Sequence, residues 1–173
     1  DKFPFERHEQ FRHPKHAFTK EQFEALIEAA KNHFIEIIPL QQSFGHLEYV
    51  LRQEKYKWLR ETETSTGEIC PSRPEAYQLI TGMLEEIIGK HPDSRYIHLG
   101  CDEVYSLCEC EICRDRYAGS KGKAFVGFVN RLIEYCAARG KTPILWHDML
   151  EKCEPEELRK LDKRAVVMIW IYN

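Results

Sequence analysis

The chain has 173 residues, of which 43% are hydrophobic and 31% charged, and its formal net charge at pH 7 is −3. These values are typical of one globular domain with a sizeable core, and they exclude a disordered chain or a coiled coil. Lysine and arginine are scattered among acidic residues, so we expect no nucleic-acid partner. No apolar run reaches the ~20 residues that cross a bilayer, so we expect no membrane association.

The N-terminal segment, DKFPFERHEQFRHP, has neither the basic start nor the apolar stretch of a signal peptide, and no initiator Met precedes it. We therefore expect a piece of a longer polypeptide, with a cytoplasmic location and the nucleus left open as a second one. The seven cysteines are an odd number, which favours reduced thiols over a disulfide framework. The alternative is zinc bound by Cys108, Cys110 and Cys113, if a fourth ligand lies near them.

The first predicted helix follows Thr19, because Thr19 and Gln22 have capping-box spacing and apolar residues then recur at helical period up to about residue 33. The apolar, β-branched run 34–40 predicts a buried strand, which Pro39 limits near its end. Residues 41–46 are then the loop that leaves this strand.

Ser72 and Glu75 repeat the capping-box spacing and predict a second helix, which ends at Gly89. The run 96–100 predicts the next strand. After a cysteine-rich loop, apolar residues at helical spacing predict a helix over 125–136, closed by Gly140.

The C-terminal third is predicted to contain a strand over 142–146, a short helix over 154–161 and a strand over 165–172. The alternation of helices and strands along the whole chain requires a parallel sheet with right-handed crossovers. Four strands are too few to close an eight-stranded barrel of ~250 residues. We therefore predict an α/β fold, part of a (β/α)8 TIM barrel, with residues 1–173 forming part of a single catalytic barrel. The alternative is a small open sheet, although no G-x-G-x-x-G loop that would bind a nucleotide follows any strand.

The most informative motif is His98-Leu99-Gly100-Cys101-Asp102-Glu103-Val104-Tyr105, in which an apolar strand leads directly into two adjacent carboxylates. By composition alone, two such acids indicate a solvated loop at least as well as a catalytic pair. The H-x-G-x-D-E arrangement, however, resembles the signature of glycoside hydrolase family 20. The stretch Gly-Cys-Asp-Glu-Val-Tyr and the Phe-Gly-His loop at 44–46 resemble one branch of that family most.

This resemblance implies a retaining, substrate-assisted β-N-acetylhexosaminidase without a cofactor, whose substrate is a glycoside ending in N-acetylgalactosamine or N-acetylglucosamine. Glu103 would be the general acid that protonates the leaving oxygen and later the base that activates water. Asp102 would orient the 2-acetamido group of the substrate, whose carbonyl oxygen attacks the anomeric carbon to give an oxazolinium intermediate. Both acids can reach one sugar only if the strand ends or bends near Gly100, because neighbouring residues of a strand point to opposite faces.

Further site residues follow from the same resemblance. His46 would contact Glu103, with Asp1 as a carboxylate partner behind it; the simpler interpretations are a surface histidine and a frayed terminus. Trp146 and Trp170, at the ends of successive strands, would wall the acetamido pocket, the alternative being core tryptophans.

Asp148 would contact a sugar hydroxyl, whereas His98 is expected to hold the loop structurally. His147 departs from its relatives, which tend to carry an acid there, and this puts the substrate preference in doubt. The Arg that clamps the sugar in this family would precede Asp1, and the Tyr that contacts the acetamide would follow Asn173. An isolated chain of this length should therefore turn over poorly, if at all.

Two other functions remain open at this stage. One is a metal-dependent barrel hydrolase that uses His46, His98, His147 and Asp148 as ligands. The other is a catalytically silent carbohydrate-binding or interaction module. The sequence also leaves a homodimer open.

Overall fold

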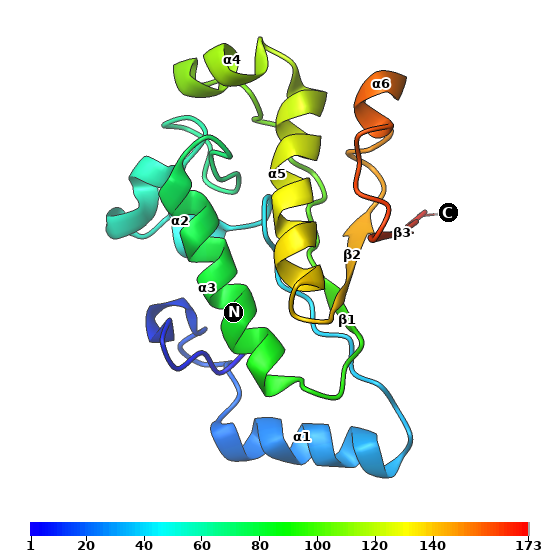
Figure 1. Ribbon diagram of the computed structural model, residues 1–173. Coiled ribbons are helices and arrows are strands. Elements are labelled where there is room, and N and C mark those ends of the chain that lie inside the picture. Colours follow the sequence, from blue (N-terminus) through cyan, green and yellow to red (C-terminus); the bar gives the residue numbers. More distant parts are fainter. Residues whose placement is uncertain (173) are drawn as a thin grey trace.

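The structure of the protein is a computed structural model, and it describes residues 1–172. The small sheet lies beside the long helix α5 (Lys121–Ala137), and the short helices α4 (Glu111–Tyr117) and α6 (Pro155–Leu158) lie at the end of the molecule opposite to α1 (Lys20–Asn32) (Figure 1). Within the described residues, no helix is both long and apolar enough to span a membrane. The elements follow the chain in the order η1 (Glu9–Phe11), α1 (Lys20–Asn32), α2 (Glu48–Leu51), η2 (Glu54–Leu59), α3 (Pro74–Lys90), β1 (Tyr96–His98), α4 (Glu111–Tyr117), α5 (Lys121–Ala137), β2 (Thr142–Trp146), α6 (Pro155–Leu158) and β3 (Val166–Met168).

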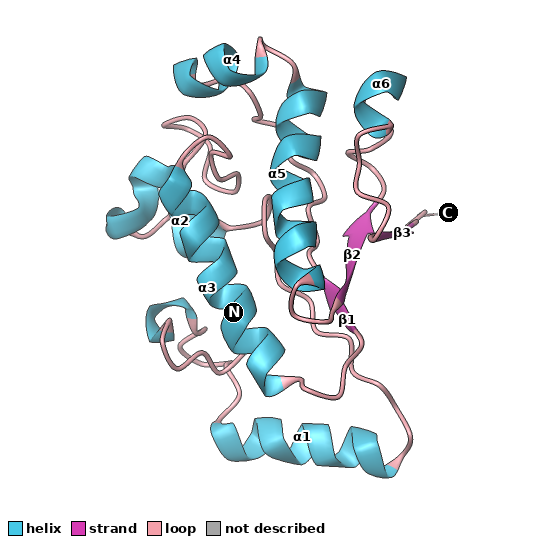
Figure 2. Ribbon diagram, viewed as in Figure 1, coloured by secondary structure: helices cyan, strands magenta, loops and turns pink. Residues whose placement is uncertain are grey.

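The sheet is parallel, with the strand order β1-β2-β3, and helices connect its strands (Figure 2). Ile97 of β1 pairs with Pro143 of β2, and Leu145 of β2 pairs with Val167 of β3. This arrangement of parallel strands and crossover helices confirms the predicted part of an α/β barrel. The β2 arrow in Figure 1 points away from α1, so the carboxyl ends of the strands face the end of the molecule where α6 lies.

The predicted strand over 34–40 is wrong in its extent. Phe34 has a left-handed backbone (φ 55°) and is 98% exposed, so the run begins as a turn after α1. Only Leu40 forms a bridge, to His98, and the pairing continues beyond the expected end, where the N–H of Ser43 donates to the carbonyl of Leu99 over 3.1 Å. The segment therefore lines up with β1 through residues 40–43, several residues later than its hydrophobicity predicts.

The helix ends show why local patterns succeed at one position and fail at another. Thr19 and Gln22 form both hydrogen bonds of the predicted capping box, so α1 begins as expected. Ser72 does not cap α3, which begins at Pro74, because its hydroxyl instead lies 3.0 Å from the Cys113 sulfur. The Ser72 side chain thus makes a tertiary contact in place of the helix cap that the local pattern predicted.

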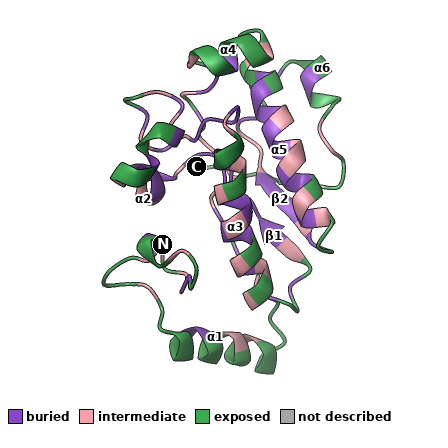
Figure 3. Cartoon of the chain, turned by 60° about the vertical axis from the view of Figure 1, so that its left-hand side comes forward, coloured by how far each residue is buried: buried purple, intermediate pink, exposed green. Residues whose placement is uncertain are grey.

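The core is formed by buried residues of β1, β2, α3 and α5, which are coloured purple in Figure 3, together with residues of η1, α2 and η2. Phe44 is fully buried there, with its ring centroid 5.7 Å from that of Phe125 and 4.7 Å from that of Phe128. In contrast, the side chains of β3 are exposed within the described residues, and this strand is shorter than the predicted 165–172.

Candidate active site

The backbone after β1 bends sharply, and the bend brings the two acids together. β1 ends at His98, and Gly100, Cys101 and Glu103 all have left-handed backbones, with φ values of 67°, 66° and 52°. Such φ values break the alternation of side chains along a strand. A Cβ atom on Gly100 would lie 1.9 Å from Oε1 of Gln42, so a larger residue would displace that side chain and would also be strained by the left-handed backbone.

Asp102 and Glu103 converge on a single nitrogen of His46. The Nε2 atom of His46 lies 3.2 Å from Oδ2 of Asp102 and 3.3 Å from Oε2 of Glu103. The side chain of Asp102 is 16% exposed and that of Glu103 is 40% exposed, so both carboxylates can be reached from solvent. The structure thus brings together the three residues to which the sequence assigned the central chemistry.

His46 reaches this position because its own loop packs against the bend. His46 also has a left-handed backbone, with φ 55°. A Cβ atom on Gly45 would lie 2.5 Å from the carbonyl oxygen of Asp102, so the two loops touch at a residue without a side chain. The sequence predicted Gly45 and His46 as a motif, but the reason for the glycine is this close approach.

Two further side chains hold the acidic pair in place. Gln42 donates from Nε2 to Oδ1 of Asp102 over 3.1 Å, and the N–H of Glu103 donates to Oδ2 of Asp148 over 3.0 Å. The other oxygen of Asp148, Oδ1, is buried and has no hydrogen-bond partner within residues 1–172. Asp148 is thus tied to the backbone of Glu103 and keeps one oxygen available. The sequence did not single out Gln42, whose only signal was its place at the end of an apolar run.

His98 stabilises the backbone bend that follows β1. Its Nδ1 accepts a hydrogen bond from the N–H of Gly100 over 3.0 Å, and its ring centroid lies 4.3 Å from that of Trp146. Burial lowers the pKa of His98 to about 4, although the neighbouring Asp102 carboxylate acts in the opposite direction. His98 is therefore neutral at pH 7 and accepts the Gly100 N–H at Nδ1.

The two tryptophans occupy different surroundings. Trp146 ends β2 half-buried and packs on His98, which accepts a hydrogen bond from Gly100 just before the acidic pair. Trp170 is also half-buried, but its ring contacts those of His147, at 5.6 Å, and Tyr172, at 5.2 Å. The structure thus places Trp146 against His98 and Trp170 beside His147.

The expected contact between Asp1 and His46 is wrong. The carboxylate of Asp1 accepts a hydrogen bond from the N–H of Phe3 over 2.8 Å, and its carbonyl accepts one from the N–H of His13 over 2.6 Å. Asp1 thus closes a turn in its own N-terminal loop. The only carboxylates within 4 Å of the His46 ring in the described part of the chain are those of Asp102 and Glu103.

The ligand set expected for a metal-dependent hydrolase does not assemble. In residues 1–172, the only group of three or more potential ligands with mutually close donor atoms consists of Glu61, Cys70, Cys110 and Cys113. His46, His98, His147 and Asp148 form no such group, which removes the geometric basis for a catalytic metal at the strand ends.

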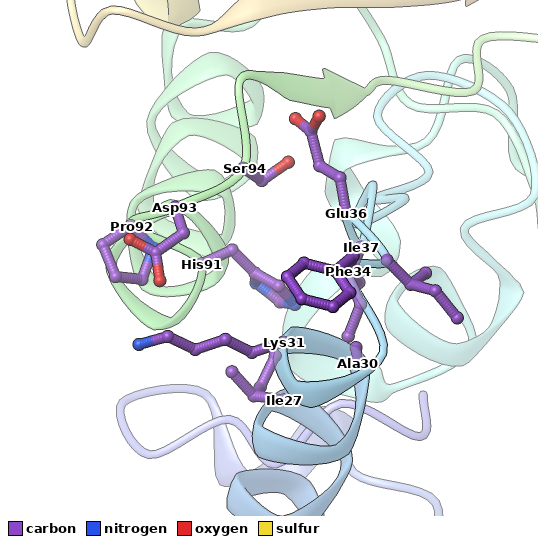
Figure 4. Close-up of a pocket in the computed structure, with 11 residues that line it drawn as sticks. Ile27, Ala30, Lys31, Phe34, Glu36, Ile37, His91, Pro92, Asp93 and Ser94 are labelled. Carbon is purple, nitrogen blue, oxygen red and sulfur yellow. The ribbon is translucent and has the colours of Figure 1, made fainter.

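A hollow lies at the other end of the sheet from the acidic pair. It is bounded by α1, by residues 34–37 and by the segment His91–Ser94 that precedes β1 (Figure 4). Its lining is mixed: Lys31, Glu36 and Asp93 are among its polar members, and Phe34 and Ile37 are among its apolar ones. Active sites of α/β barrels lie at the carboxyl ends of the strands, so we assign no catalytic role to this hollow at the amino ends.

The parallel strands, the crossover helices and the acidic pair that follows β1 define part of an α/β barrel with a candidate active site. The family model of the glycosyl hydrolase family 20 catalytic domain matches residues 5–173, and the chain belongs to this family.

Among the most similar relatives, hexosaminidase D of Bos taurus is 32% identical over 180 residues, which cover all of this chain and 52% of the bovine protein. Hexosaminidase D of Homo sapiens is 31% identical, again over the whole chain, and 37% of the human protein is covered. A solved beta-N-acetylhexosaminidase from Bacteroides fragilis NCTC 9343 superimposes with a TM-score of 0.78 at 21% identity, covering 96% of this chain and 36% of that one. The chain thus spans about half or less of these relatives, and hexosaminidase D represents the branch that its motifs resemble.

Proposed function

We propose that this chain carries the catalytic acids of a retaining β-N-acetylhexosaminidase that releases terminal N-acetylgalactosamine or N-acetylglucosamine from glycosides. The observation that carries the proposal is the convergence of Asp102 and Glu103 on Nε2 of His46, at 3.2 Å and 3.3 Å. Two partly exposed carboxylates that meet at one histidine nitrogen are close enough together to act on neighbouring atoms of one sugar. Family membership and the similarity to hexosaminidase D support the same conclusion.

The proposed first step cleaves the glycosidic bond. Glu103, in its protonated form, donates a proton to the leaving oxygen as the bond to the anomeric carbon breaks. The carbonyl oxygen of the 2-acetamido group forms the new bond to that carbon, while Asp102 accepts the acetamide N–H and stabilises the positive charge of the oxazolinium ring. Gln42 holds Asp102 for this role from the opposite oxygen.

The second step returns the site to its starting state. Water attacks the anomeric carbon, the bond to the acetamide oxygen breaks, and the Glu103 carboxylate takes the proton of the water. Because the anomeric carbon is attacked twice, the product retains the β configuration. His46 contacts both acids and therefore keeps them in one geometry through both steps.

The first experiment tests Glu103 as the acid. Glu103→Gln in the full-length protein should lower kcat by about 10²- to 10⁴-fold on a nitrophenyl N-acetyl-β-hexosaminide. The loss should be smaller for a dinitrophenyl leaving group, which departs without a proton. Glu63→Gln is the matched control, because Glu63 is an exposed loop acid, and it should leave both rates unchanged. Undiminished turnover of Glu103→Gln would remove Glu103 from the mechanism.

The second experiment tests the participation of the acetamido group. Substrates with N-acetyl, N-fluoroacetyl and N-trifluoroacetyl groups should be cleaved at steadily decreasing rates, because fluorine withdraws electrons from the attacking carbonyl oxygen. In Asp102→Asn, this dependence on the substituent should change together with a lower kcat. Equal rates across the three substrates would exclude the substrate-assisted step.

A further inference from the structure

A cluster of three thiols and one carboxylate lies outside the active site. Glu61 and Cys70 come from the long excursion between Leu40 and α3, whereas Cys110 and Cys113 surround the start of α4. The Cys70 sulfur lies 3.6 Å from that of Cys110 and 3.5 Å from that of Cys113. Oε2 of Glu61 lies 3.3 Å from the Cys113 sulfur, and the four ligand atoms all lie within 4.8 Å of one another.

These separations match the edges of a zinc tetrahedron. With Zn–S bonds of about 2.3 Å and a Zn–O bond of about 2.0 Å, tetrahedral angles place two sulfurs about 3.8 Å apart and a sulfur and an oxygen about 3.5 Å apart. The three distances given above are each within a few tenths of an ångström of these values, and the remaining ligand atoms lie within 4.8 Å of one another. A disulfide, in contrast, needs about 2.05 Å between two sulfurs and cannot pair three thiols.

Glu61 gives an independent indication of a cation. This side chain is 2% exposed, and the hydrogen-bond partners of its carboxylate within residues 1–172 are the N–H groups of Glu109 and Cys110 and the thiol of Cys113. None of these partners carries a positive charge, although a buried carboxylate is stable only when it is paired or binds a metal. Both N–H groups donate to Oε1, which leaves Oε2 directed at the cluster, as outer hydrogen bonds direct the carboxylate ligands of metal sites.

The surroundings of the sulfurs are also those of thiolate ligands. Cys110 and Cys113 have the C-x2-C spacing of zinc sites, and the N–H of Cys113 donates to the Cys110 sulfur over 3.3 Å. The Ser72 hydroxyl lies 3.0 Å from the Cys113 sulfur. Cys108, which the sequence suggested as a ligand, is directed elsewhere, because its thiol donates to the carbonyl of Cys113.

From these observations we propose that Glu61, Cys70, Cys110 and Cys113 bind one structural zinc ion. Four protein ligands fill the coordination sphere, so the site leaves no position for substrate and is not catalytic. The ion connects the chain that follows His46 with the chain that follows Glu103. It therefore links the loop that supplies His46 to the loop that supplies Asp102 and Glu103, at a point away from the sugar. The cluster stands apart from the glycosidase assignment and can be tested without any substrate.

The test measures metal in the purified protein. Elemental analysis after gel filtration should give about one zinc per chain, and replacement by Co²⁺ should give the thiolate charge-transfer and visible bands of a tetrahedral site. Cys110→Ser, at the least buried of the three thiols, should lose most of the zinc and the cobalt spectrum. Cys108→Ser, in the same loop but outside the cluster, should retain both.

Several results would overturn the proposal. One is purified protein without stoichiometric zinc that also fails to produce the cobalt spectrum when Co²⁺ is added to the reduced thiols. Another is zinc content that Cys110→Ser leaves unchanged, or that only Cys108→Ser abolishes. A mass spectrum that shows Cys70 in a disulfide with Cys110 or Cys113 in the freshly purified protein would also exclude the ion. Because the metal content and cobalt spectrum of the unaltered protein decide the matter first, a variant that fails to fold does not leave the question open.

Discussion

Replacing Gly45 by alanine should separate the acidic pair from its histidine without removing any functional group. The added Cβ would lie 2.5 Å from the carbonyl oxygen of Asp102 and 3.3 Å from a methyl group of Val104, whereas ordinary contacts begin at 3.4 Å. The backbone of Asp102 must therefore move by 3.4 − 2.5, or about 0.9 Å, away from the His46 loop. Overpacking of this kind costs about 1–3 kcal/mol of stability.

A displacement of about 1 Å in a catalytic group can lower activity about 100-fold. We therefore expect kcat/KM of Gly45→Ala to fall by about 100-fold while the variant stays folded, as measured by steady-state assays and urea unfolding. Gly89→Ala is the matched control, because nothing lies within 4 Å of the added atom inside α3. It should retain full activity and gain up to about 1 kcal/mol. A folded Gly45→Ala with wild-type kcat/KM would refute the coupling between the two loops.

Three further predictions concern single side chains. His46→Gln should lower kcat by at least about 10-fold in the same assays, because the group that contacts both acids is lost. The free energy of unfolding should change little. A wild-type kcat would contradict this role of His46. Burial lowers the pKa of His98 from 6.5 to about 4, so its neutral form contributes stability above pH 6.5 that is lost as the pH falls towards 4. This contribution is at most about 3 kcal/mol. The unfolding free energy of His98→Gln should therefore depend less steeply on pH between 4 and 6.5. An unchanged slope would contradict the lowered pKa of His98. Phe44→Ala, at a fully buried ring, should cost about 3–5 kcal/mol in urea unfolding, whereas Phe34→Ala, at a ring 98% exposed, should change stability by less than about 0.5 kcal/mol.

The local sequence predicts elements well where a short-range interaction decides them. The capping pair Thr19 and Gln22 acts within one turn of helix, so the start of α1 follows from the spacing of two residues. The predictions fail where a distant residue competes. Ser72 has the same local pattern, but it contacts Cys113, which lies 41 residues away along the chain.

The candidate site also contains some features that the sequence predicted and others that it did not. The alternation of helical and apolar strand patterns was sufficient to predict parallel strands, whereas Asp102 and Glu103 as an acidic pair, with His46 beside them, followed from the resemblance of the H-x-G-x-D-E and Phe-Gly-His motifs to glycoside hydrolase family 20. These features depend on residue type and on short spacing, both of which the sequence records directly.

Only the tertiary structure decided which groups meet. In the structure both carboxylates contact one nitrogen of His46, and Gln42 also contacts Asp102, whereas Asp1 lies outside the site. The thiol cluster contains Cys70 and Glu61 but not Cys108. The physical reason is that such contacts join segments far apart in the chain. They depend on left-handed turns and on close backbone approaches at Gly45 and Gly100, and these form only when the loops pack against each other.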